Sequence, residues 1–127
     1  MARLLIVDDS NYIRTRIERI FTNKDDIEVV AKAANGKVGV CYLNLYQPDI
    51  VTMDLTMPEM DGIACIEKMR QEKPDIDILV VSALSDKATG IEALTKGARG
   101  FLCKPFTDDQ LLEALGKILQ RKYKEAK

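Results

Sequence analysis

Leu4-Leu5-Ile6-Val7-Asp8-Asp9-Ser10 begins with a continuous apolar run of strand length and ends in two acids and a serine. A continuous apolar run is typical of a strand that is covered on both faces of its sheet. Ser10 is a residue type that caps helices, and Ile13, Ile17 and Ile20 follow it at helical spacing. The segment therefore predicts a buried strand that leads through an acidic turn into an amphipathic helix.

The same alternation of a short apolar run and a longer amphipathic segment recurs along the chain. The further strand-length runs are Ile27 to Ala31, Ile50 to Met53, Ile78 to Val81 and Phe101-Leu102-Cys103. A strictly alternating series of strands and helices predicts a parallel sheet with helices on both faces, joined by right-handed crossovers. We predict an α/β fold with a doubly wound, five-stranded parallel sheet and five helices, and residues 1–127 as one domain.

Details of three elements can be predicted as well. In the second strand Ile27, Val29 and Ala31 alternate with other residues, which predicts that they share one face of an edge strand. Ser85 is the expected cap of the fourth helix, and Thr107-Asp108-Asp109-Gln110 has the form of a capping box at the start of the last helix. Because the fourth helix has few large apolar residues, we expect it to be the mobile one.

Composition excludes several classes of function. The chain has 19 Lys and Arg, 20 Asp and Glu and no His, so catalysis by a Ser-His or Cys-His pair is impossible. Its nearly balanced charge offers no electrostatic footprint for nucleic acid, and no run of about 18 apolar residues predicts a membrane span. The odd number of cysteines, Cys41, Cys65 and Cys103, predicts small buried thiols in the reducing cytoplasm.

Polar side chains follow four of the five predicted strands. They are Asp8 and Asp9, Asp54, Ser82 and Lys104, in chain order. Each residue alone is an ordinary turn or surface residue, but ligands of open parallel sheets sit at the carboxyl ends of the strands, where these five meet. Crowded carboxylates repel one another unless a cation joins them, and Mg²⁺ suits an all-oxygen site of this kind. The acidic turn after the first strand lacks the glycines of a nucleotide-binding loop.

Four motifs in order resemble the receiver domain of two-component response regulators. They are Ile6 to Ser10, Asp49 to Gly62, Val81-Ser82-Ala83 and Lys104-Pro105-Phe106, and the resemblance covers the whole chain. It is strongest to single-domain chemotaxis regulators, the CheY family. The resemblance implies a flavodoxin-like fold with strand order 2-1-3-4-5.

The resemblance also implies a role for each residue at the predicted sheet edge. Asp54 matches the phosphoacceptor, a carboxylate that takes a phosphoryl group from a phosphohistidine. Asp9, Asp54 and the backbone carbonyl of Thr56 match the Mg²⁺ ligands, and Asp8 matches the second acid, which orients metal-bound water. Lys104 matches the lysine that pairs with the phosphoryl oxygens.

Further positions match the parts of such a domain that respond to the phosphoryl group. Ser82 matches a hydroxyl that bonds the phosphoryl group, Pro105 a proline after a cis peptide bond, and Phe101 an aromatic switch position. From the pattern alone, Phe101 is equally well an aromatic residue of a buried strand. We expect phosphorylation of Asp54, which adds about -1.5 to -2 charges, to draw Ser82 in and let Phe101 turn inward. Leu84 is apolar and cannot orient water, which predicts slow to moderate loss of the phosphoryl group.

The expected function is that of a phosphorylation-activated signalling switch whose catalysis is limited to its own phosphorylation and dephosphorylation. The resemblance implies a CheA-like sensor histidine kinase as donor, Mg²⁺ as cofactor, and a protein target such as the flagellar motor switch, with the chain as a cytoplasmic monomer. The alternatives are a phosphorelay intermediate, a receiver cut from a larger regulator, and a receiver that works without phosphorylation. An aspartyl-phosphate phosphatase is disfavoured because Thr56 stands where that class has a second Asp.

Overall fold

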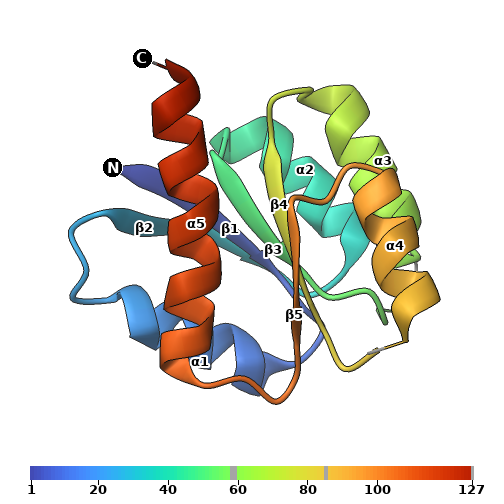
Figure 1. The fold of residues 1–127 in the computed structure, drawn as a ribbon, viewed down its shortest axis with the longest axis horizontal. Helices are drawn as coiled ribbons and strands as arrows, with labels where there is room; N and C mark the ends of the chain where they lie inside the picture. Colours follow the sequence, from blue (N-terminus) through green and yellow to red (C-terminus); the bar gives the residue numbers. More distant parts are fainter. Residues whose placement is uncertain (58–59, 85, 127) are drawn as a thin grey trace.

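The chain folds into a parallel five-stranded sheet between two layers of helices in the computed structural model (Figure 1). The structure describes residues 1–57, 60–84 and 86–126, the last six by their backbone alone. The strands are β1 (Ala2–Val7), β2 (Ile27–Ala33), β3 (Ile50–Met53), β4 (Asp77–Ser82) and β5 (Gly100–Cys103). The helices are α1 (Asn11–Phe21), α2 (Gly36–Tyr46), α3 (Gly62–Glu72), α4 (Lys87–Thr95) and α5 (Asp108–Ala126). The strand order β2-β1-β3-β4-β5 confirms the predicted fold class and topology.

Two apolar cores lie on the two faces of the sheet. Helices α1 and α5 cover one face and α2, α3 and α4 the other, as the separation of the two groups in Figure 1 shows. The side chains of β1 point alternately into the two cores. Leu4 and Ile6 pack under α1 and α5, and Leu5 and Val7 pack under α2 and α3. The strands that read as continuous apolar runs are therefore the ones covered on both faces.

The predicted edge position of β2 is confirmed, but the predicted face is wrong for Ala31. Its register with β1 shifts between Leu4 and Leu5, so that Leu4 pairs with Val29 and Leu5 with Ala31. The extra residue in β2 moves the following side chains to the opposite face, because side chains alternate along a strand. Ile27 and Val29 consequently pack under α1 and α5, whereas Ala31 packs on the α2 side.

Two of the three expected helix caps are confirmed. The Ser10 side chain accepts a hydrogen bond from the Ile13 N–H at 3.3 Å. Thr107 and Gln110 form the predicted reciprocal box, with each side chain accepting from the other's backbone N–H at 3.1 and 2.9 Å. The cap of α4 is Asp86 rather than Ser85, which lies outside the described residues. Only Ala93 of α4 is buried, in keeping with the few large apolar residues that its sequence offers.

The expectation of three buried cysteines is wrong for two of them. Cys65 is buried in α3, and burial raises the pKa of its thiol to about 12. Cys41 and Cys103 are exposed, and all three thiols are free. Among the described residues, no helix combines the length and the apolar character that crossing a membrane requires.

The Thr52 hydroxyl of β3 is buried without a hydrogen-bond partner among the described residues. An unpaired buried hydroxyl keeps its desolvation cost, and valine has nearly the same shape without that group. Thr52→Val is therefore expected to raise the free energy of unfolding by about 1 kcal/mol in urea titrations. The same substitution at Thr89, whose hydroxyl donates to Asp86 at 2.7 Å, is expected to lower it. A destabilised Thr52→Val variant would contradict this account.

Candidate functional site

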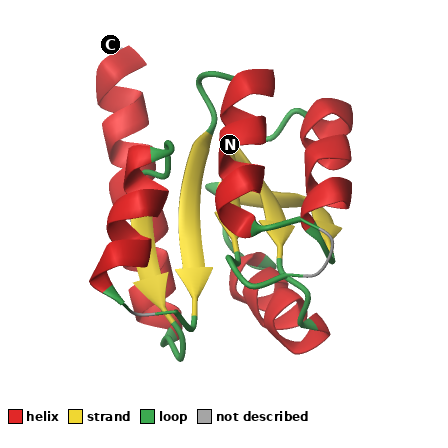
Figure 2. Ribbon diagram, turned by 90° about the vertical axis from the view of Figure 1, so that its right-hand side faces the viewer, coloured by secondary structure: helices red, strands yellow, loops and turns green. Residues whose placement is uncertain are grey.

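The carboxyl edge of the sheet collects the polar residues that the sequence places after the strands. Asp8 and Asp9 follow β1, Asp54 follows β3, Ser82 ends β4, and Lys104 follows β5. The strand arrowheads point to the same edge in Figure 2, because all the strands are parallel. Side chains that are up to 96 residues apart in sequence therefore meet there.

The turn after β1 is held by its own hydrogen bonds. The Asp8 N–H donates to the Ala33 carbonyl of β2 at 3.0 Å, and the Asp8 carboxylate accepts from the Ser10 N–H at 2.9 Å. Arg14, one turn into α1, donates to the Asp8 carbonyl at 2.6 Å. Arg14 belongs to none of the motifs that the sequence predicts as functional. Its position six residues after Asp8 is the only sequence feature that could have indicated the bond to the Asp8 carbonyl.

Asp54 lies at the end of β3 with 3% of its surface exposed. Its N–H donates to the Val7 carbonyl at 2.9 Å, which ties the end of β3 to β1. The backbone N–H and the hydroxyl of Thr56 both lie 3.4 Å from one oxygen of its carboxylate, at the long end of hydrogen bonding. The other oxygen faces Lys104, and the carboxylate is thus held with few strong donors around it.

Lys104 is the positively charged residue among the five that follow the strands. Its Nζ donates to the Asp8 carboxylate at 2.8 Å and lies 3.8 Å from the Asp54 carboxylate, and 18% of its side chain is exposed. Its backbone N–H donates to the Ser82 carbonyl at 2.9 Å. The Lys104-Pro105 peptide bond is cis, as expected. One ammonium group stands against three carboxylates, so the site keeps a net negative charge.

Neither Ser82 nor Phe101 bonds to the acids among the described contacts. The Ser82 side chain is fully buried, and its oxygen accepts from the Leu84 N–H at 3.1 Å. Phe101 is half-buried and packs against the core on the α2, α3 and α4 side. Leu84 is 37% exposed beside Ser82. The structure thus places the Ser82 hydroxyl at this edge, engaged in its own turn, whereas Phe101 lies inside β5 beside Val80 of β4.

The acids form a group that suits a divalent cation. One carboxylate oxygen each from Asp8, Asp9 and Asp54 lies within 4.8 Å of the others. Asp9 is exposed, and the other two are buried. Hard oxygen donors with an excess of negative charge fit Mg²⁺, which binds through a few carboxylates and keeps waters. The Thr56 carbonyl stays a predicted fourth ligand.

Crowding changes the acidity of Asp54. Burial, and next the Asp8 carboxylate, raise the pKa of Asp54 from 3.8 to about 6, against the lowering influence of Lys104 and the Thr56 N–H. Since the folded state holds this proton more tightly than the unfolded state, the contribution of Asp54 to stability is fully present below a pH of about 3.8 and is lost as the pH rises through about 6. At pH 7 without a metal ion, the ionised Asp54 therefore destabilises the fold.

Asp54→Asn is expected to raise the free energy of unfolding of the metal-free protein at pH 7. A shift of about two pKa units is worth about 3 kcal/mol, of which solvent and counterions at the sheet edge screen a part, so about 1 to 2 kcal/mol is expected. The gain should vanish at a pH of about 3, below both the unfolded value of 3.8 and the folded value of about 6, where Asp54 is protonated in both states. Urea titrations in EDTA at the two pH values measure it.

Asp109→Asn serves as the matched control for that experiment. Asp109 is an exposed acid in the first turn of α5. Its removal is expected to change stability at pH 7 by less than about 0.5 kcal/mol, in the destabilising direction, because acids favour helix N-termini. An equal stabilisation by both variants would mean that general charge, and not the site, is responsible.

Comparisons with known proteins connect this geometry to one family. Residues 4–116 match the response regulator receiver domain. The chain is 43% identical over 117 residues to the chemotaxis protein CheY of Listeria monocytogenes, which covers 92% of this chain and 98% of the relative. The chemotaxis protein CheY of Bacillus subtilis is also 43% identical over 117 residues, with 92% and 97% covered.

The solved structures agree with the relatives. A crystal structure of the CheX-CheY-BeF3-Mg²⁺ complex from Borrelia burgdorferi contains a chain that aligns with a TM-score of 0.87 and 33% identity, covering 93% of this chain and 89% of that one. The range matched by the family, 4–116, contains all the predicted site residues.

Proposed function

Because the chain belongs to the family of response regulator receiver domains, we propose that Asp54 is its phosphoryl acceptor and that phosphorylation there switches its binding to a partner protein. Receiver domains of two-component systems are signalling switches that take up and release a phosphoryl group, and no other catalytic activity is indicated. The observation that carries the proposal is the position of Asp54, buried beside two further acids and 3.8 Å from the ammonium group of Lys104.

The chemistry proposed for Asp54 is the transfer of a phosphoryl group from a donor histidine to its carboxylate. An oxygen of its carboxylate attacks the phosphorus atom of the donor and forms the O–P bond of an acyl phosphate, while the N–P bond of a phosphohistidine breaks. The imidazole keeps the electron pair of that bond and takes up a proton. Above a pH of about 6 Asp54 is ionised and therefore ready to attack.

The proposed role of Lys104, and of the acids that would hold Mg²⁺, is to neutralise the negative charge of the phosphoryl group on Asp54. Lys104 lies where its ammonium group can approach the oxygens of a phosphoryl group on Asp54, and phosphoryl transfer depends on such positioned cations. Asp8, Asp9, Asp54 and the Thr56 carbonyl would hold Mg²⁺, which when bound supplies positive charge to the phosphoryl oxygens. Arg14 fixes the backbone of the acidic turn through the Asp8 carbonyl.

The proposed response begins at Ser82. Its hydroxyl hydrogen is free to donate to a phosphoryl oxygen, because the oxygen acts as acceptor in the present bond from the Leu84 N–H. Phe101 would then turn inward, and α4, which buries only Ala93, would shift with it. The face of α4, β5 and α5 would carry the signal. Amide chemical shifts on this face that stay unchanged on phosphorylation would contradict the response.

The setting and the partners of this switch are the finer part of the proposal. The names of the relatives support chemotaxis as the setting. For that setting we propose a CheA-like histidine kinase as donor and the flagellar motor switch as target, with the chain acting as a monomer in the cytoplasm. A phosphorelay intermediate and a receiver within a larger regulator are the alternatives. A pull-down with BeF3 and Mg²⁺ distinguishes chemotaxis from a phosphorelay. Capture of a motor switch protein supports chemotaxis, and capture of a histidine phosphotransfer protein supports a relay.

Chemical trapping tests the acceptor directly. The protein is loaded with phosphoramidate and Mg²⁺ and then treated with borohydride, which reduces an aspartyl phosphate to homoserine. Peptide mass spectrometry is expected to find homoserine at position 54 and at no other aspartate. Homoserine at position 8 or 9 instead would overturn the assignment.

A further inference from the structure

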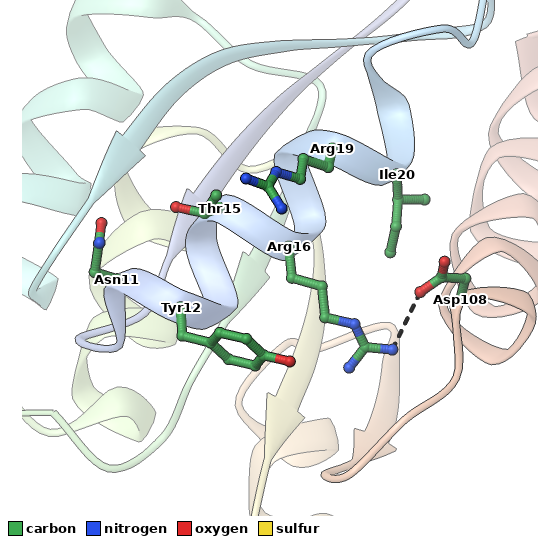
Figure 3. A pocket seen from close by; sticks show the side chains of 7 residues that line it. All are labelled: Asn11, Tyr12, Thr15, Arg16, Arg19, Ile20 and Asp108. Carbon is green, nitrogen blue, oxygen red and sulfur yellow. Dashed lines mark hydrogen bonds and ion pairs between the residues drawn. The ribbon is translucent and has the colours of Figure 1, made fainter.

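Arg16 of α1 makes three contacts with the segment that enters α5. Its Nη2 donates to the Phe106 carbonyl at 2.6 Å and to the Asp108 carboxylate at 3.1 Å. Its guanidinium carbon lies 4.4 Å from the centre of the Phe106 ring. Arg16 lines a pocket of about 580 Å³. Figure 3 shows its side chain reaching from α1 to Asp108. One side chain thus joins two segments that are 90 residues apart in sequence.

The segment that Arg16 holds is the continuation of Lys104. Phe106 comes two residues after Lys104, and its side chain is 4% exposed within the core under α1 and α5. Lys104 itself is anchored on the other side, through its N–H to the Ser82 carbonyl. In the described part of the chain, Arg16 is the side chain that bonds the Phe106 carbonyl. The loop is therefore fixed at β4 before Lys104 and at α1 after it.

We propose that Arg16 is a positioning residue, which holds the loop after β5 so that the Lys104 ammonium group stays against the acid group. The proposal rests on the proposed function in so far as Lys104 assists phosphoryl uptake. The hydrogen bond to the Phe106 carbonyl and the stacking on the Phe106 ring are the contacts that support this role. The ion pair with Asp108 contributes little, because the Asp108 carboxylate is 63% exposed.

Arg19 provides a matched control on the same helix. It lines the same pocket and carries the same charge, but it makes no side-chain bond to the segment 106–108 in the part of the chain that the structure describes. Figure 3 shows its side chain pointing away from Asp108. Arg16→Gln and Arg19→Gln thus remove the same charge from one surface, and only the first removes the contacts to the loop.

The test measures the rate of Mg²⁺-dependent phosphoryl uptake from phosphoramidate by intact-mass spectrometry. Arg16→Gln is expected to slow uptake about tenfold, since small displacements of positioned groups have effects of this order. Arg19→Gln is expected to change it by less than about twofold. In a Lys104→Gln background, Arg16→Gln should cause no further slowing, because its effect passes through Lys104. Equal slowing in both backgrounds, or a stability loss with unchanged uptake, would overturn the proposal.

A second readout separates this proposal from the proposed function. The ¹⁵N chemical shift of the Lys104 Nζ in the metal-free protein reports its contact with Asp8 whether or not the chain is phosphorylated. Arg16→Gln is expected to move this shift toward that of exposed lysines, and Arg19→Gln to leave it unchanged. An unmoved shift in Arg16→Gln would overturn the positioning role, whereas a wild-type chain that takes up no phosphoryl group would overturn only the function.

Discussion

Gly62→Ala is expected to lower the free energy of unfolding by about 2 to 4 kcal/mol and to slow phosphoryl uptake by about 100-fold. A Cβ at Gly62 would overlap the Leu55 Cα and approach the Asp54 carbonyl oxygen to 2.9 Å. Both neighbours are backbone atoms, which cannot rotate away as a side chain could. The Gly62 N–H also donates to the Leu55 carbonyl at 3.2 Å, so the start of α3 is seated directly on the segment that follows the acceptor.

Gly116→Ala is the matched control for Gly62→Ala. Gly116 lies in α5, and a Cβ built there meets no atom within 4 Å. The same substitution is therefore expected to raise the free energy of unfolding by about 0.5 to 1 kcal/mol, because alanine favours the helix, and to leave uptake unchanged. Urea titrations and intact-mass kinetics measure both variants. A Gly62→Ala variant as stable and as fast as the wild type would mean that the close approach at Leu55 is not needed.

Lys104→Gln is expected to slow phosphoryl uptake by about 100-fold or more while it tightens Mg²⁺ binding. Uptake slows because the transferred phosphoryl oxygens lose a positioned cation. Metal binding tightens because removal of one positive charge within 4 Å of two carboxylates leaves a more negative site for a divalent ion. Isothermal titration with Mg²⁺ and intact-mass kinetics measure the two opposite effects.

Lys117→Gln removes the same charge far from the site. Lys117 is an exposed residue of α5 that pairs with Glu113 at 3.3 Å one turn away. Neither uptake nor Mg²⁺ affinity is expected to change in this variant. Weaker Mg²⁺ binding in Lys104→Gln would indicate that the lysine organises the acids rather than competing with the metal ion for them.

The sequence was sufficient to predict the convergence of Asp8, Asp9, Asp54 and Lys104, because this follows from topology. Once the strands are parallel, residues after their carboxyl ends must share one edge. The helix caps Ser10 and Thr107 were predictable for a similar reason, since a cap depends on residues within one turn. The roles of these site residues in phosphoryl transfer stay predictions that the experiments above test.

Features that depend on packing between distant segments could not be predicted in this way. The shift of register in β2 puts Ala31 on the face opposite to Ile27, and no local pattern marks an extra residue in a strand. The exposure of Cys41 and Cys103 depends on what lies next to them in space, not on residue type. Arg14 and Arg16 read as ordinary charges of an amphipathic helix, although their guanidinium groups reach the backbone of two loops.

Intact-mass spectrometry of the wild-type chain and of Asp54→Asn tests the central claim most directly. Each protein is incubated with phosphoramidate, with Mg²⁺ or with EDTA, and quenched rapidly. The wild type is expected to gain one phosphoryl group of about 80 Da with Mg²⁺ only, and Asp54→Asn is expected to gain none. A wild-type chain that gains no mass after rapid quenching, or an equal gain in Asp54→Asn, would contradict the account of Asp54 as the phosphoryl acceptor.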